Sequence, residues 1–428
     1  MERFQITGPT PLVGRVRASG AKNAALPALA AALLTDEPLR LRRVPGVRDL
    51  RTMRRLLAHL GVDGDDERPA EGDGGVLVLR RARPNSPGDA PYDLVKTMRA
   101  SVLVLGPLLA RHGFARVSLP GGCAIGVRPI DQHLKGLAAL GAEVRLEHGY
   151  VETRAGRLAG ARFRFDLPTV TGTENLLLAA SLARGTTVLE NCAREPEVVD
   201  LARLLNAMGA RIEGAGGETV VVEGVDELGG ASHTVIPDRI EGGTYLIGAA
   251  LSGGDVLLEG AEAADLAPLL DKLAEIGASV EVTAEGIRVA AGRGTPPLRA
   301  CDLDTAPHPG FPTDLQAQYM ALMTCAEGVS TIRETVFENR FQHALELARM
   351  GADVRVEGGA ARVYGRTPLS GAAVMATDLR ASACLVLAGV AATGQTVVDR
   401  IYHLDRGYEG MELKLQALGA RVERVPEP

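Results

Sequence analysis

The sequence predicts an α/β protein of two lobes, each built from three similar repeats. An apolar helical stretch, a glycine and a strand recur in this order six times along the chain. A second strand precedes most copies, and 428 residues are more than one ordinary hydrophobic core accommodates. Six units of about 70 residues divide into two lobes of three. Because small ligands usually bind in clefts, we expect the ligand site in a cleft between the lobes.

The repeated glycines are Gly61, Gly141, Gly209, Gly277, Gly351 and Gly419. Before each of them, Leu, Ile or Met recurs at helical spacing, and apolar and polar residues alternate after it. Each glycine is therefore expected to end a helix in a left-handed conformation.

The second strand that precedes most copies is expected in GFARVSLPGG, RGTTVLENC, GGDVLLEGA, EGVSTIRET and TGQTVVDR. Each unit is thus a mixed βαβ module. The N-terminal strand FQITG is expected to pair with the far lobe, so lobe one comprises residues 22–236 and lobe two comprises 1–21 with 237–428. The acidic stretch from Asp63 to Asp89 is expected to be a surface excursion that contains the short strand VLVLR.

Composition indicates a soluble globular protein, with 46% apolar and 23% charged residues. A net charge of −6 and only 3% aromatic residues argue against a general partner role toward nucleic acid or an anionic membrane. The N-terminus has no secretory pattern and no run of eighteen apolar residues occurs, so we expect a cytoplasmic protein. Its five cysteines are scattered without metal-ligand spacing, which predicts reduced thiols and no metal site.

Cys123 lies in the glycine-rich segment SLPGGCAIGVRPIDQHL, an unusual place for a packing cysteine. Arg128 provides a nearby cation, which makes a thiol a better acid or nucleophile. Pro129 suits the first position of a helix, so Arg128 is expected at a helix N-terminus, where anions bind favourably. On these residues alone, a functional thiol and a packing thiol both remain open. The other four cysteines, in or beside apolar or strand-like stretches, are expected to be packing residues.

Further polar residues gather at the ends of predicted elements. Lys22 and Asn23 immediately precede an Ala-rich helix and are typical of an anion site, although a solvated surface lysine is the simpler interpretation. Asp314 stands at a predicted helix start, where aspartate is a good N-cap, so a capping role is the simpler interpretation. Several arginines lie at element boundaries, a distribution expected for a ligand with two anionic groups. A repeat scaffold for protein contacts is the alternative to an enzyme at this point.

The motifs together resemble the UDP-N-acetylglucosamine enolpyruvyl transferases, the family that opens the cytoplasmic branch of peptidoglycan synthesis and so serves cell wall formation. The resemblance covers essentially the whole chain and is carried by SGAKNAALP, APYDLVKTMRAS, SLPGGCAIGVRP, GTEN, AREPEVVD, PDRIEGGT, PHPGFPTDLQAQ, TVFENRF, ATDLRASA and IYHLDRGYE, in the family's order. It implies a fold of two inside-out α/β lobes with six repeats, the number that the glycines predict.

The resemblance also implies the site residues. Those implied to hold phosphoenolpyruvate are Lys22, Asn23, Arg128, Arg380 and Arg406. Those implied to hold the UDP-sugar are Arg99, Arg128, Pro129, Ile130, Asp131, Gln132, Thr169, Val170, Asp314 and Val336. Cys123 is implied to be the acid that protonates C3 of phosphoenolpyruvate, and Asp314 to take the proton of the sugar hydroxyl. No cofactor or metal is expected, because arginine and lysine offset the charge.

Three alternatives stay open. The chain could be a paralogue acting on another nucleotide sugar, a 5-enolpyruvylshikimate-3-phosphate synthase, or a nucleotide-sugar sensor without activity. Leu167 and Pro168 stand where some family members have a lysine near the nucleotide, and Gly242 is also unusual. The departures at Leu167 and Pro168 therefore concern the contacts to the uridine end.

Overall fold

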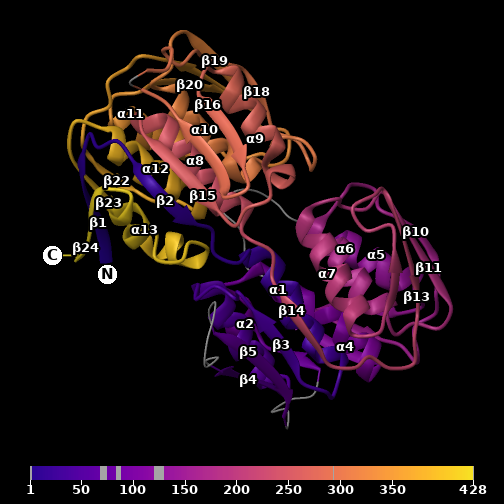
Figure 1. Cartoon of the computed structure of the whole chain (residues 1–428). Helices are drawn as coiled ribbons and strands as arrows, with labels where there is room; N and C mark the ends of the chain where they lie inside the picture. Colours follow the sequence, from indigo (N-terminus) through magenta and orange to yellow (C-terminus); the bar gives the residue numbers. More distant parts are fainter. Residues whose placement is uncertain (1, 68–74, 83–87, 120–129, 293, 428) are drawn as a thin grey trace. The chain divides into compact units, whose positions relative to one another are not determined.

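The chain, described here from a computed structural model, folds into two compact units (Figure 1). The structure describes residues 2–67, 75–82, 88–119, 130–292 and 294–427. Residues 2–19 with 237–427 form one unit, and residues between 20 and 236 form the other. Each is a mixed α/β unit, as the sequence predicts. Cys123, Arg128 and Pro129 lie outside the described residues.

Every sheet follows one plan of four strands, and six such sheets occur in the described part of the chain. In the sheet β10-β11-β13-β12, the first two strands are parallel and the remaining pairings are antiparallel. A helix precedes the second strand of each sheet and another follows it, which gives a βαβαββ repeat.

Three repeats make up the unit of residues 20–236. The first contains α1 (Lys22–Ala31), η1 (Ala32–Leu34), β3 (Leu39–Arg42), α2 (Arg48–His59), β4 (Val62–Glu67), β5 (Val76–Arg81) and the distant strand β14 (Ala231–Thr234). The second contains β6 (Asp89–Ala90), α3 (Tyr92–Val95), η2 (Arg99–Val104), α4 (Leu105–His112), β7 (Phe114–Ser118), α5 (Asp131–Ala139), β8 (Glu143–Glu147) and β9 (Tyr150–Arg154). The third contains β10 (Arg162–Arg164), α6 (Val170–Ala180), β11 (Thr186–Glu190), α7 (Pro196–Ala207), β12 (Arg211–Glu213) and β13 (Thr219–Glu223).

The other unit holds the remaining three repeats. The fourth contains β2 (Val13–Arg17), α8 (Arg239–Ser252), β15 (Asp255–Glu259), α9 (Ala263–Glu275), β16 (Ser279–Thr283) and β17 (Gly286–Ala290). The fifth contains β18 (Leu303–Asp304), η3 (Thr313–Leu315), α10 (Gln316–Met323), β19 (Val329–Arg333), α11 (Gln342–Arg349), β20 (Asp353–Glu357) and β21 (Ala360–Tyr364). The sixth contains β22 (Ala373–Met375), α12 (Leu379–Ala391), β23 (Gly394–Asp399), η4 (Ile401–Arg406), α13 (Met411–Ala417), β24 (Arg421–Pro426) and β1 (Glu2–Gly8).

The N-terminal segment completes two sheets of the unit that contains the C-terminus. β1 lies between β23 and β24, with Phe4 opposite Val398 and Ile6 opposite Val422, and all four side chains are buried. β2 pairs in parallel with β15 in the fourth repeat. The predicted pairing of FQITG in the far lobe is thereby confirmed.

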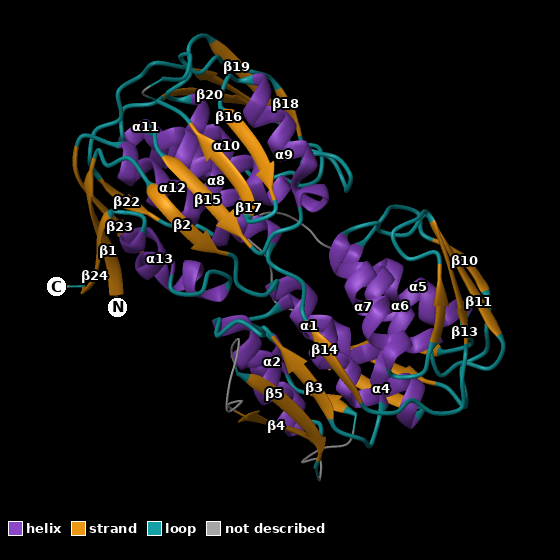
Figure 2. Ribbon diagram, in the orientation of Figure 1, coloured by secondary structure: helices purple, strands orange, loops and turns teal. Residues whose placement is uncertain are grey.

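Helices occupy the interior of each unit, and the sheets lie outside them (Figure 2). In α8 every residue from Ile240 to Leu251 is buried, and in α12 every residue from Arg380 to Val390. Such helices need small residues where they approach each other. In the other unit, a Cβ on Gly106 of α4 would lie 2.3 Å from Asn175 Oδ1 of α6. This interior placement of apolar helices is what makes the lobes inside-out.

The six repeat glycines end their helices with positive φ, between 91° at Gly61 and 106° at Gly209. At Gly209, the next residue closes the turn, because the amide of Ala210 donates to the carbonyl of Leu205 at 2.9 Å. Within the predicted excursion beyond Gly61, the expected strand VLVLR is confirmed as part of β5, and Val62–Glu67 adds the edge strand β4 beside it.

Gly209→Ala is expected to lower the free energy of unfolding by about 1 to 2 kcal/mol, because L-residues rarely adopt its φ. A steric clash is not the cause, since no atom lies within 4 Å of a Cβ added at Gly209. Gly156→Ala is the matched control, with the same open surroundings and no positive φ, and should change stability by less than about 0.5 kcal/mol. Urea denaturation followed by circular dichroism measures both.

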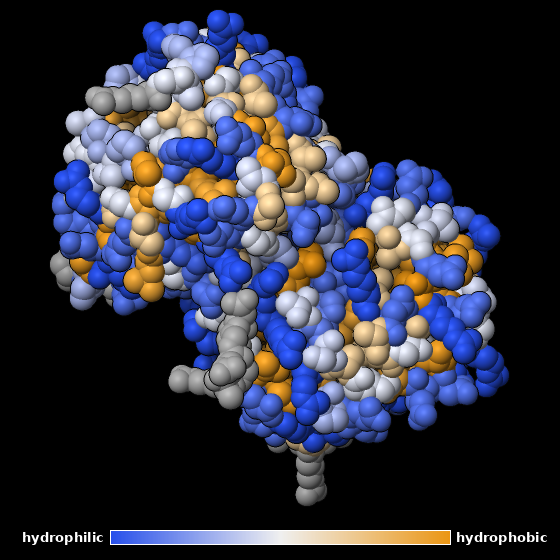
Figure 3. Space-filling model, viewed as in Figure 1, coloured by the Kyte–Doolittle hydropathy of each residue, from blue (hydrophilic) through white to orange (hydrophobic). Residues whose placement is uncertain are grey.

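Polar side chains cover most of the face drawn in Figure 3, with apolar ones interspersed. None of the helices among the described residues has the length and apolar character needed to cross a membrane.

Candidate active site

The predicted site residues lie in both units, most of them at the starts of helices. In the unit of residues 20–236, Lys22 and Asn23 are the first two residues of α1, where the sequence places them just before the helix. The Lys22 side chain is 12% exposed, and its Nζ lies 3.5 Å from Asp49 Oδ2 in the first turn of α2. A largely buried ammonium with a carboxylate partner is not a simple solvated surface charge.

Two further helix starts carry the residues predicted to contact the nucleotide. α5 begins at Asp131, with Ile130 as its N-cap, and Pro129, the predicted first helical position, lies outside the described residues. Thr169 is the N-cap of α6, and its Oγ1 accepts a hydrogen bond from Gly172 N at 3.2 Å. Val170 is the first residue of α6, and Arg99 begins η2.

Hydrogen bonds join the start of α5 to the segment that leads into α6. Gln132 Nε2 donates to Asp166 Oδ2 at 2.8 Å, and the amide of Asp166 donates to Gln132 Oε1 at 2.9 Å. Lys135 Nζ lies 2.6 Å from the same Asp166 Oδ2. The structure thus brings Asp131 and Gln132 together with the segment before Thr169 and Val170. Leu167 is 71% exposed in this segment, and nearby Lys135 is a cation that the sequence analysis missed.

The neutral ring of His133 supports this junction between α5 and α6. Burial, assisted by Arg99, lowers its pKa to about 4. The amide of Asn175 must donate to His133 Nδ1 at 2.9 Å, so the ring proton is on Nε2, which donates to Thr171 Oγ1 at 3.2 Å. The ring therefore ties α5 to the first turn of α6.

The other unit holds Asp314 between two arginines. Asp314 Oδ1 lies 2.7 Å from Arg340 Nη2, and Asp314 Oδ2 lies 2.6 Å from Arg380 Nη2. Both arginine side chains are almost completely buried, whereas a quarter of the Asp314 side chain is exposed. Burial alone would raise the pKa of the Asp314 carboxyl, but Arg380 and Arg340 outweigh burial and hold it well below its ordinary value.

This ion-pair arrangement corrects the interpretation of Asp314 as a helix cap. Asp314 is the middle residue of η3, and the N-cap position belongs to Pro312, which has no capping side chain. Its carboxylate instead forms ion pairs with the two arginines. Arg340, in the TVFENRF segment, is one of the boundary arginines expected to gather around an anionic ligand, and the structure pairs it with the Asp314 carboxylate.

Buried polar groups support Asp314 and Arg380 from the interior. Gln318 Nε2 donates to the carbonyl of Asp314 at 3.1 Å and to Thr244 Oγ1 at 3.0 Å. Thr244 Oγ1 and Tyr408 OH are 2.9 Å apart, and the Arg380 guanidinium lies over the Tyr408 ring, 5.6 Å from its centroid. Sequence reasoning missed these three supporting residues, because each appears as an ordinary member of an apolar helix or turn.

Arg406 and Val336 lie in the same unit. Arg406 is the last residue of η4 and is half-buried. Its neighbour Asp405 is held by Arg424 of β24 through two contacts of 2.7 and 3.1 Å. The amide of Val336, in the loop after β19, donates to Glu334 Oε1 at 2.9 Å.

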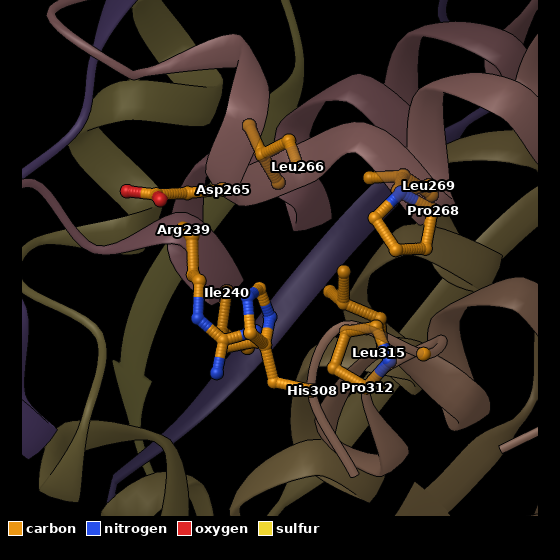
Figure 4. Close-up of a pocket in the computed structure, with 10 residues that line it drawn as sticks. Arg239, Ile240, Asp265, Leu266, Pro268, Leu269, His308, Pro312 and Leu315 are labelled. Carbon is orange, nitrogen blue, oxygen red and sulfur yellow. The ribbon is translucent and has the colours of Figure 1, made fainter. Parts of the chain in front are cut away.

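A narrow pocket opens beside η3 (Figure 4). It is lined by Arg239, Ile240, Asp265, Leu266, Pro268, Leu269, His308, Gly310, Pro312 and Leu315. In Figure 4, Arg239 and His308 lie on one side, whereas Pro268 and Leu269 lie near Leu315 and Pro312. Among the predicted site residues that the structure describes, none lines this pocket, although its lining residues Pro312 and Leu315 lie within two positions of Asp314 in sequence.

Comparison with known proteins identifies the family. The family described as EPSP synthase (3-phosphoshikimate 1-carboxyvinyltransferase) matches residues 6–415. A relative from Sorangium cellulosum named UDP-N-acetylglucosamine 1-carboxyvinyltransferase is 58% identical over 426 residues, which cover 99% of both chains. Relatives with the same name from Koribacter versatilis and Anaeromyxobacter dehalogenans are 56% and 59% identical over 97% and 100% of their lengths and 99% or more of this chain.

Two solved structures share the fold. The enolpyruvyl transferase NikO from Streptomyces tendae superposes with a TM-score of 0.87 at 29% identity, covering 100% of this chain and 99% of NikO. EPSP synthase from Acinetobacter baumannii gives a TM-score of 0.74 at 20% identity over the full length of both chains, which indicates a common fold. The predicted fold class and resemblance are therefore confirmed, and the chain belongs to the enolpyruvyl transferase family.

Proposed function

We propose that this protein is the enzyme that transfers the enolpyruvyl group of phosphoenolpyruvate to the 3′-hydroxyl of UDP-N-acetylglucosamine and releases phosphate. The observation that carries the proposal is the 56–59% identity, over nearly the whole chain, to relatives named for this transfer. In a bacterial cell this reaction serves the synthesis of peptidoglycan in the cytoplasm, and both substrates are small molecules.

The proposed chemistry is an addition followed by an elimination. Cys123 protonates C3 of phosphoenolpyruvate, which makes C2 electrophilic, and the sugar hydroxyl adds to C2 while Asp314 takes its proton. The tetrahedral intermediate then loses a proton from C3 and expels phosphate. Proton gain and loss at C3 balance, and the enolpyruvyl ether and phosphate are the products.

Each unit contributes residues to the proposed substrate contacts. Lys22, Asn23 and Arg128 bind phosphoenolpyruvate together with Arg380 and Arg406. The UDP-sugar is bound at the joined starts of α5 and α6, by Ile130, Asp131, Gln132, Thr169 and Val170 with Arg128 and Pro129, and by Arg99. Asp314 and Val336 bind the reacting sugar end. The buried guanidinium of Arg380, the largely buried ammonium of Lys22 and the half-buried Arg406 suit this role, because they offset anionic charge where water is scarce.

The proposal explains how Asp314 becomes a base. While Arg340 and Arg380 both pair with Asp314, the pKa of its carboxyl is too low for effective proton abstraction. Arg380 is proposed to bind the anionic donor substrate, so that it no longer neutralises Asp314. With one cation fewer beside the carboxylate, the pKa of Asp314 rises when the reaction requires a base. Arg340 remains bound and keeps the carboxylate oriented.

Acceptor-dependent phosphate release tests the function. The purified protein is incubated with phosphoenolpyruvate and, separately, UDP-N-acetylglucosamine, other nucleotide sugars, shikimate 3-phosphate or no acceptor. We expect phosphate release with UDP-N-acetylglucosamine. Release only with another nucleotide sugar indicates the paralogue, release only with shikimate 3-phosphate indicates the sister enzyme, and release without acceptor reveals hydrolysis of the donor.

A further inference from the structure

Glu334 is a buried carboxylate that directly follows β19 and has no assigned role. Its side chain is the acceptor of four hydrogen bonds, and the residue is 8% exposed. Oε1 accepts from Thr305 Oγ1 at 2.9 Å and from the amides of Val336 at 2.9 Å and Phe337 at 3.2 Å. Oε2 accepts from Thr313 Oγ1 at 2.8 Å. Burying a carboxylate costs free energy unless the group is fully hydrogen-bonded, and the four hydrogen bonds to Glu334 meet this requirement.

The four donors come from three separate segments of the fifth repeat. Thr305 follows β18, Thr313 is the first residue of η3, and Val336 and Phe337 begin the loop after β19. A second link reinforces the junction, because the amide of Thr335 donates to Thr305 Oγ1 at 3.0 Å. One carboxylate therefore fixes η3 and the loop relative to each other.

Both of these segments carry residues of the proposed acceptor site. Asp314 directly follows Thr313, and Val336 is itself one of the donors to Glu334. The loop continues to Arg340, whose guanidinium returns to Asp314 at 2.7 Å. The loop is thus anchored at its start by Glu334 and at its end by the ion pair, and a shift of its start displaces Val336 from Asp314.

We propose that Glu334 is a positioning residue for the acceptor substrate, which acts by holding the Val336 backbone and Asp314 in their mutual arrangement. This inference rests on the proposed function and adds a residue to it. Glu334 acts through its neighbours and is not expected to touch the reacting atoms. Residues proposed to bind phosphoenolpyruvate make none of the four contacts, so the effect should be specific for the acceptor.

Steady-state kinetics of Glu334→Ala with varied concentrations of each substrate tests the proposal. We expect KM for UDP-N-acetylglucosamine to rise about tenfold, because two amides and two hydroxyls lose their acceptor. The turnover number should also fall, and KM for phosphoenolpyruvate should change less than about twofold. Glu259→Ala is the control, since Glu259 ends β15 in the same unit and pairs with Arg15 at the surface.

Two conservative variants separate positioning from folding. Glu334→Gln should restore much of the acceptor affinity, because its amide oxygen accepts from Val336 and Phe337 and its NH₂ group donates to Thr313. Thr313→Val removes one donor without changing the volume and should shift the same KM by a smaller factor. If Glu334→Ala does not fold, these two variants decide the question.

Several results would overturn the inference. They are equal increases in both KM values, a lowered melting temperature with unchanged kinetics, and Glu334→Gln behaving like the alanine variant. Failure of the proposed function is distinguishable, because the wild-type protein itself would then release no phosphate with UDP-N-acetylglucosamine.

Discussion

Asp314→Asn is expected to destabilise the protein and to lower the turnover number by about 10²- to 10⁴-fold. The carboxylate is the partner of two buried guanidinium groups, so an amide leaves two buried cations uncompensated. Breaking a buried ion pair typically costs about 3 to 5 kcal/mol, and the lower end applies because Asp314 is one-quarter exposed. Urea denaturation measures the stability, and assays well below the unfolding midpoint measure turnover.

The stability difference between wild type and Asp314→Asn should depend on pH. Asp314 has a lower pKa in the folded than in the unfolded protein, so its contribution is complete above the unfolded value of about 3.9. It is lost as pH falls through the lower pKa of the folded state. The difference in the free energy of unfolding between wild type and Asp314→Asn should therefore be large at neutral pH. It should be smaller below about pH 4.

Asp304→Asn is the control for Asp314. Asp304 also pairs with an arginine, Arg333 at 3.1 Å, but both side chains are more than half exposed. Exposed pairs contribute little, so this variant should keep the stability and activity of the wild type. A stable Asp314→Asn protein with normal turnover would contradict both the charge argument and the proposed base.

The sequence predicts the repeats well because each is a local pattern. A glycine with positive φ ends a helix through contacts within six residues, as the bond from Ala210 to Leu205 illustrates. Partners far apart in sequence are less predictable. Nothing in Ala231–Thr234 indicates that β14 completes a sheet by pairing with β3, almost 200 residues earlier.

In the candidate site too, the sequence predicts local features better than contacts between residues far apart in the chain. Motif resemblance predicts Asp314 and Arg380, but their direct contact joins residues 66 positions apart and replaces the expected helix cap. Cys325 is exposed, which contradicts its predicted packing role, whereas Cys192 and Cys384 are buried as predicted.

Cys123→Ala is expected to abolish turnover near neutral pH, the largest effect on activity together with that of Asp314. The expectation comes from the glycine-rich loop with Arg128 and from the proposed protonation of C3. Initial-rate measurements of phosphate release quantify it. Cys325→Ala is the matched control, because it removes an exposed thiol remote in sequence from the loop and should leave the rate unchanged.

Alkylation by an epoxide analogue of phosphoenolpyruvate tests whether the same thiol is the reactive one. The thiolate is the nucleophile, and the other four cysteines form it poorly. Burial raises the pKa of Cys192 to about 12 and also raises the pKa of Cys384. Cys325 is exposed as a residue, but partial loss of solvation at its sulfur still raises the pKa of its thiol. Burial raises the pKa of Cys301 as well, although Lys272 Nζ lies 3.2 Å from its sulfur. Peptide mapping by mass spectrometry should therefore place the label on Cys123, and a label on any of the other four would refute its assignment as the activated acid.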